Sequence, residues 1–202
     1  YNLYVLANTD KMLPPLNEKA IMSLACHMNA SGKSMPMCWK QTGVSVTHDQ
    51  TICVKLVRLM AKVVLNVKNN VPGLGVSSVS LMQAPSCVRP FAFSGSRASY
   101  EETDMGDFAA AEDIAVLNEG GDIAFYVFEN MQGVLLEGNA DPMKKVPDNI
   151  SSAASVCTYL DVRCDFEYGY DKEGTVEYRI YLGRDNVADF NIERNSVLKT
   201  TL

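Results

Sequence analysis

The sequence lacks most of the features that mark membrane spans and nucleic-acid binding. It contains no run of about 18 apolar residues, so no membrane-spanning helix is expected. Acidic residues outnumber basic ones by 24 to 18, which gives a net charge of −6. Binding to a phosphate backbone needs a basic surface. We therefore do not expect nucleic acid as a partner.

Signatures of catalytic, cofactor and metal sites are also missing. The only histidines are His27 and His48, and neither has metal-ligand spacing to another histidine or to a cysteine pair. The nucleophile motif G-x-S-x-G does not occur. Residues 31–34, Ser-Gly-Lys-Ser, resemble the end of a phosphate-binding loop, but His27 stands where that loop needs glycine. We predict no catalytic, cofactor-binding or metal-binding residues, and a protein that is not an enzyme.

Six cysteines are present, at positions 26, 38, 53, 87, 157 and 164, and none forms a C-x-x-C pair. Cys157 and Cys164 fall on one predicted strand, about 23 Å apart at ~3.3 Å per residue, which is too far for a mutual disulfide. Buried free thiols agree with the usual burial of cysteine. One disulfide among other pairs, or a metal site, remains an alternative.

What the sequence does contain is strand pattern, most clearly near its C-terminus. Val176, Tyr178, Ile180 and Leu182 alternate with polar or amphipathic residues, which is typical of a strand with one buried face. A Gly-Arg-Asp-Asn turn follows at 183–186, and a second strand is predicted at 190–194. Residues 156–168 and 175–182 are predicted to form a hairpin.

The rest of the chain adds further strands and little helix. Strands are predicted at 1–8, 43–47, 51–67, 76–82 and 122–130. A helix is predicted over 17–29, with Asn17 as its N-cap and an apolar stripe behind it, and a short helix over 108–117. Residues 84–107 and 138–155 are predicted to be loops. This pattern predicts a mainly β fold with strands at sandwich-like spacing.

Turn-forming residues at 69–75, Asn-Asn-Val-Pro-Gly-Leu-Gly, predict a domain boundary. We expect one β-sandwich domain over 1–68 and a second over 72–202. The chain opens directly on an apolar strand, so we expect the first domain to be incomplete, with earlier strands missing.

Several short blocks, in this order and spacing, resemble the fimbrillins, the lipoprotein subunits of type V pili. The blocks are residues 3–9 (LYVLANT), Pro36-Met37, 56–63 (LVRLMAKV), 125–130 (FYVFEN), 178–183 (YRIYLG) and 192–195 (IERN). The resemblance covers 1–67 and 122–202 well and 76–121 poorly. The sequence departs from the family where Cys38-Trp39 follows the Pro-Met pair, and in lacking the family's first strands and the segment after the last block.

The resemblance implies two transthyretin-like Greek-key β-sandwich domains. It also implies an exported lipoprotein of the outer-membrane surface, trimmed by a protease and assembled into a fimbrium that supports cell adhesion. Its partners would be other pilin subunits, joined by strand donation, in which a strand of one subunit enters an open groove of its neighbour. Host or bacterial surface ligands are further possible partners.

The alternative function is a surface module that binds a glycan or a host protein and does not polymerise. Exposed aromatic residues in the 84–107 loop, namely Phe91, Phe93 and Tyr100, would carry that function.

Overall fold

The structure is a computed structural model that describes residues 1–9, 17–27, 35–93, 95–150, 156–167 and 173–202. It is mainly β, as predicted. The longer elements are β1 (Leu3–Ala7), α1 (Glu18–Met22), β3 (Met37–Gln41), β5 (Met60–Asn66), β6 (Leu74–Met82), α2 (Ala111–Asn118), β10 (Asp122–Phe128), β11 (Asn130–Val134), β12 (Tyr159–Glu167), β13 (Glu173–Tyr181), β14 (Asp189–Ile192) and β15 (Val197–Thr201). Short elements are β2 (Cys26–His27), β4 (Val57–Arg58), β7 (Ala84–Pro85), β8 (Cys87–Val88), β9 (Thr103–Asp104) and three 3₁₀ turns, η1 (Tyr100–Glu102), η2 (Pro142–Lys144) and η3 (Pro147–Asn149).

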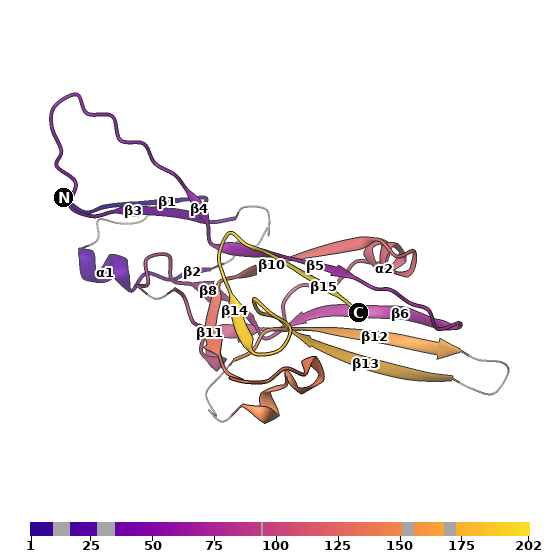
Figure 1. The fold of residues 1–202 in the computed structure, drawn as a ribbon. Coiled ribbons are helices and arrows are strands. Elements are labelled where there is room, and N and C mark those ends of the chain that lie inside the picture. The colour runs from indigo at the N-terminus through magenta and orange to yellow at the C-terminus, as the bar shows by residue number, and fades with distance from the viewer. Residues whose placement is uncertain (10–16, 28–34, 94, 151–155, 168–172) are drawn as a thin grey trace.

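Two three-stranded sheets form the main sandwich (Figure 1). One has the strand order β13-β12-β6, with antiparallel pairing throughout. The other has the order β10-β5-β15, in which β10 is antiparallel and β15 parallel to the central β5. The main core lies between them and includes Val63, Phe125, Val79 and Leu160, one from each of four strands. Alternation along β5 explains this, because Ala61, Val63 and Leu65 are buried while Lys62 between them is exposed.

The N-terminal residues form a separate small sheet with the order β1-β3-β4 (Figure 1). Its core is shared with later parts of the chain, since Cys26 and Cys38 pack with Leu59, Val88 and Phe128. A third cluster, built on Leu136, Cys157, Ala188 and Phe190, lies beside the β11–β14 pair.

The predicted division into 1–68 and 72–202 does not follow these sheets. Strand β5 lies before the predicted boundary, yet it is the central strand between β10 and β15. The turn at 69–75 therefore connects two strands that face each other across one core. A cluster of turn-forming residues does not reveal which sheet the flanking strands join.

Several local predictions were wrong. The predicted loop at 84–107 contains the short strands β7, β8 and β9 and the turn η1. The helix is limited to Glu18–Met22, because Cys26 and His27 pair as strand with Val88 and Cys87; the end of the predicted helix, 28–29, lies outside the described residues. Residues 43–47 and 51–56 form no strand, and in Figure 1 the segment between β3 and β4 extends away from the body. Its apolar residues Val46, Val54 and Leu56 are 40–50% exposed. The alternating pattern favours a strand there, but no described strand lies beside this segment to form backbone hydrogen bonds with it.

Candidate functional site: an open groove between β13 and β15

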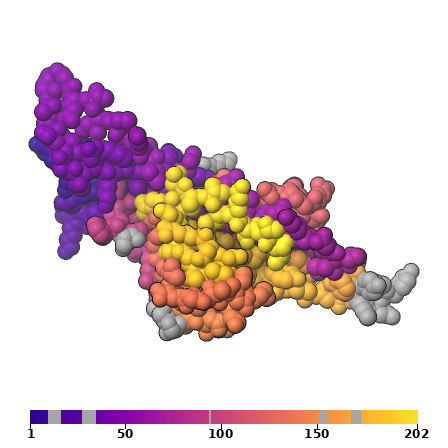
Figure 2. Space-filling view, in the orientation of Figure 1, coloured from indigo at the N-terminus to yellow at the C-terminus, as the bar shows by residue number. Residues whose placement is uncertain are grey.

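A groove of about 790 Å³ lies between β13 and β15. Each of these is the edge strand of its sheet, and among the described residues no further strand pairs with either of them; Pro142, Met143 and Lys145 line one part of the groove. The C-terminal strand, yellow in Figure 2, lies on the surface of the face shown. The groove is thus an open side of the main sandwich.

The opposite side of the sandwich is closed, which shows what the groove lacks. Helix α2 packs against both β6 and β10 and buries Leu117 in the main core. The Asn118 side chain accepts from the Val76 N–H at 2.8 Å and donates to the Val76 carbonyl at 3.0 Å, so it occupies both backbone groups of an edge residue. Residues 106–109 form backbone hydrogen bonds with Leu81 and Val79 on the same edge of β6.

No comparable cover reaches β13 or β15 from the residues that the structure describes. The backbone pairing of β13 is with β12, and that of β15 is with β5. Among the residues that the structure describes, the outward-facing N–H and C=O groups of both strands therefore have no backbone partner. A row of such groups is a template for pairing with another strand.

Apolar side chains on the two groove strands are only partly covered. Tyr178 and Ile180 on β13, and Leu198 and Leu202 on or just after β15, pack against the main core yet remain half-buried. Their spacing of two residues on β13 places them on one face. An extended segment with apolar side chains at alternate positions could cover them and pair its backbone at the same time.

One end of the groove is built around Lys145, which is buried. Its Nζ donates to the Asp185 carbonyl at 2.7 Å and lies 4.9 Å from the centre of the Phe190 ring. Burial lowers the pKa of this amine to about 8. The turn after β13 is held in place by this contact and by Asp185, whose side chain accepts from the Ala188 N–H at 2.7 Å.

A buried ion pair fixes the position of the segment that precedes β15. Arg194 donates through Nε to Glu129 at 2.8 Å and through Nη1 to the Pro90 carbonyl at 2.7 Å. The other Glu129 oxygen accepts from the Ser96 N–H at 2.6 Å. Sequence reasoning missed this pair, because nothing in the local pattern around Glu129 or Arg194 distinguishes them from surface charges.

Sequence reasoning also missed β15 itself, although a signal was there. Leu198, Thr200 and Leu202 are half-buried and alternate with the exposed Val197, Lys199 and Thr201. This is the same period-two pattern that correctly predicted β13.

The three aromatic residues considered for a ligand site differ in exposure. Phe91 is buried and packs edge-on against Tyr4 with ring centres 5.1 Å apart, so it cannot contact a ligand. Phe93 and Tyr100 are exposed, at 97% and 73%. All six cysteines are free; Cys53 is exposed and the other five are buried.

Comparison with known proteins supports a fimbrial fold. Over its full length the chain is similar to a candidate cell adhesion protein from Bacteroides eggerthii, with 16% identity, a TM-score of 0.57 and 67% of that chain covered. It is also similar, over 98% of its length, to the tip fimbrial protein Mfa3 from Porphyromonas gingivalis in a C-terminally truncated form, with 12% identity, a TM-score of 0.57 and 74% of that chain covered. The chain shares their fold.

These likenesses agree with the resemblance to the fimbrillins. A family model described as a domain of unknown function, DUF4906, matches residues 125–202, which include both groove strands. The comparison with curated proteins finds no match. Within the described residues, no helix has the length and apolarity needed to cross a membrane.

Proposed function

We propose that this protein is a structural subunit of a surface fimbria that assembles by strand donation and supports adhesion. In this proposal the groove between β13 and β15 accepts a strand from a neighbouring pilin subunit. The subunit would be exported as a lipoprotein and act at the outer-membrane surface, as the resemblance to the fimbrillins implies; the cell adhesion and tip fimbrial proteins with the same fold support a role at a surface.

The observation that carries the proposal is the coincidence of two unfilled features in one place. The groove exposes unpaired backbone on both of its edge strands and half-covered apolar side chains on its walls. Strand addition satisfies both, since main-chain hydrogen bonds give affinity and alternate side chains fill the pockets.

The expected gain is large enough for a durable joint. Each apolar side chain fully buried contributes about 1.5–3 kcal/mol, so four or five of them give on the order of 10 kcal/mol before the ordering costs. The acceptor would also gain cover for Tyr178, Ile180, Leu198 and Leu202.

A synthetic ten-residue peptide that alternates valine or isoleucine with threonine tests this. Bound at a concentration 100 times its Kd, it would stabilise the fold by about 2.7 kcal/mol, which a thermal melt detects. The variant Ile180→Lys places a charge in the groove and should abolish the shift.

The matched control is Val116→Lys on α2, because Val116 is 39% exposed and lies on the closed side of the sandwich. It should leave the shift unchanged, and circular dichroism shows whether both variants fold. An equal shift in wild type and Ile180→Lys would place the peptide elsewhere and contradict the proposal.

The second candidate function is a binding module for a surface glycan or a host protein that does not polymerise. The observation that favours it is the exposure of Phe93 and Tyr100, at 97% and 73%, which leaves both aromatic side chains open to a ligand. Such a module would show no response to the strand peptide and would lose ligand binding in Phe93→Ala.

A further inference from the structure

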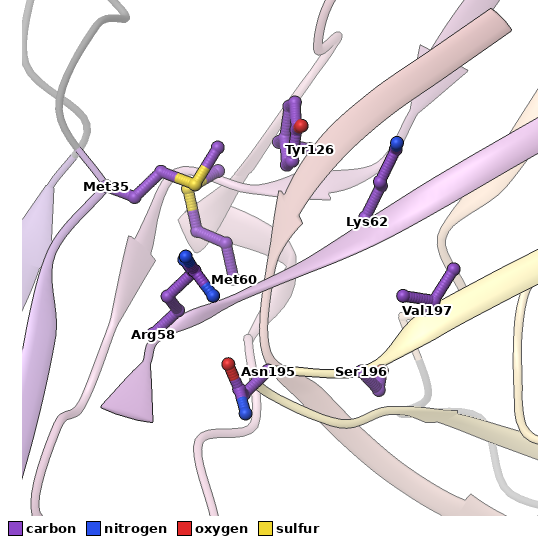
Figure 3. A pocket seen from close by; sticks show the side chains of 8 residues that line it. All are labelled: Met35, Arg58, Met60, Lys62, Tyr126, Asn195, Ser196 and Val197. Atoms are coloured by element: carbon purple, nitrogen blue, oxygen red, sulfur yellow. The ribbon is translucent and has the colours of Figure 1, made fainter. Parts of the chain in front are cut away.

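A second cavity, of about 270 Å³, opens on the outer face of the β10-β5-β15 sheet, where this sheet meets the N-terminal part of the chain (Figure 3). Arg58, Lys62, Tyr126 and Asn195 supply polar groups to its lining, and the thioethers of Met35 and Met60 lie on the side of Arg58. It meets the strand groove only at Val197, which lines both.

The strand register explains why Lys62, Tyr126 and Val197 share one face of the sheet. Lys62 lies opposite Tyr126 of β10 and beside Val197 of β15, so the three form one row across the sheet. The neighbours of Lys62 on its own strand, Ala61 and Val63, point into the core. Alternation therefore directs Lys62 and Tyr126 outward, into the cavity.

Asn195 reaches the same cavity from the turn before β15. Its backbone has φ +57°, a left-handed conformation that asparagine tolerates better than most residues. Its N–H donates to the Met60 carbonyl at 2.9 Å, which fixes the turn against β5. The side-chain amide is left at the edge of the cavity.

None of these four polar side chains has a hydrogen-bond or ion-pair partner among the residues that the structure describes. By contrast, Arg89, Arg179, Arg184 and Arg194 are each paired with a glutamate. No acidic residue lines the cavity, although the chain carries a net charge of −6. Two cations, a phenol and an amide thus line one cavity without an acidic residue among the lining residues.

We propose that this cavity binds one carboxylate-bearing sugar unit of an acidic glycan. Arg58 and Lys62 would hold the carboxylate through charge-assisted hydrogen bonds. The Tyr126 ring would contact the apolar face of the sugar, and the Asn195 amide can both donate to and accept from hydroxyls.

The size of the cavity favours a single sugar over an extended peptide. Its volume of about 270 Å³ lies just below the range of roughly 300–1,000 Å³ that is typical of drug-sized ligand pockets. An acidic peptide strand would need a long groove with alternating pockets, and here the apolar walls and the charges are confined to one spot.

The test is a titration of the full chain with glucuronate up to about 20 mM, monitored by ¹H–¹⁵N NMR. A ligand of this size is expected to bind with a Kd of about 1 mM. We expect saturable shifts at Lys62, Tyr126 and Asn195, and none with glucose, which carries a neutral hydroxymethyl group in place of the carboxylate. Arg58→Gln and Lys62→Gln should each weaken binding by about tenfold.

The matched control is Lys40→Gln, which removes one positive charge from an exposed position of β3 outside the cavity. It should bind glucuronate like the wild type.

The proposal is overturned if glucose binds as well as glucuronate, if Arg58→Gln and Lys62→Gln leave the affinity unchanged, or if no saturable shift appears. It is also overturned if a pentaglutamate peptide saturates these resonances and glucuronate does not. None of these results depends on whether the β13–β15 groove accepts a strand.

Discussion

At the scale of single residues, Arg194 joins segments that are far apart in sequence. Its guanidinium contacts Glu129, the carbonyls of Arg89 and Pro90, and the Cys38 thiol at 3.4 Å. Its side chain is 17% exposed and that of Glu129 is 4% exposed. The pair therefore links the N-terminal sheet, the 89–96 segment and the turn before β15.

Replacing Arg194 by methionine should lower the free energy of unfolding by about 3–5 kcal/mol, because Glu129 is left buried without its counter-charge. Chemical denaturation measures this. The control is Arg184→Met, whose pair with Glu193 is about half exposed and should be worth no more than about 1 kcal/mol. Equal losses in both variants would contradict the role given to Arg194.

Glu102 gives a prediction for the pH dependence of stability. The hydrogen bond from Arg89 lowers the pKa of this carboxyl to about 2, from an ordinary value of 4.5. A carboxyl whose pKa is lower in the folded state stabilises the fold above its unfolded pKa, and this contribution is lost as the pH falls from about 4.5 to about 2.

Glu102→Gln should therefore be less stable than the wild type by about 1 kcal/mol at pH 7, the upper end for a partly exposed pair, and the difference should be much smaller at pH 2, where about half of the carboxyl is protonated in the folded state. Urea denaturation at both pH values measures the difference. Glu101→Gln, next to it and exposed, should show no such change with pH. A difference for Glu102→Gln that is as large at pH 2 as at pH 7 would rule out the ion pair as its cause.

At the scale of elements, the sequence was informative where a strand has both a periodic pattern and a neighbour. The hairpin of β12 and β13 was predicted from alternation, and Leu160, Val162 and Cys164 are buried on one face as expected. The same alternation at 51–56 led to a wrong strand, because pairing depends on a partner that local sequence does not specify. The cavity residues could not be predicted either, since Arg58, Tyr126 and Asn195 meet only through sheet register.

In the turn after β13, the backbone of Asp189 lies very close to Gly183. A Cβ atom there would lie 1.7 Å from the Asp189 carbonyl oxygen and 2.9 Å from the Lys145 Nζ. Gly183→Ala should therefore shift the turn into β14 and cost about 1–3 kcal/mol, as overpacking of a close contact does. Thermal denaturation checks this.

Gly174, near the start of the same strand, provides the control. A Cβ atom there meets nothing within 4 Å, so Gly174→Ala should be neutral or stabilise the strand by about 0.5–1 kcal/mol. A Gly183→Ala protein as stable as Gly174→Ala would show that the turn relaxes freely.

At the scale of the whole molecule, the two sides of the main sandwich differ. One side is closed by α2 and by residues 106–109, and the other is an open groove between β13 and β15. This asymmetry could not be predicted from the sequence, because β15 was not recognised and β5 was assigned to a different domain. The mainly β class was predicted correctly, since it depends only on local periodicity.

Amide hydrogen exchange of β13 and β15, with and without the alternating strand peptide, tests strand acceptance most directly. In the free, dilute chain the alternate amides that face the groove should exchange rapidly, while those of the central strand β12 are protected. With the peptide bound, the groove-facing amides should become protected and β12 should stay as it was. Groove-facing amides that are already protected in the free chain, or that stay unprotected with the peptide bound, would contradict the proposal that this groove accepts a strand.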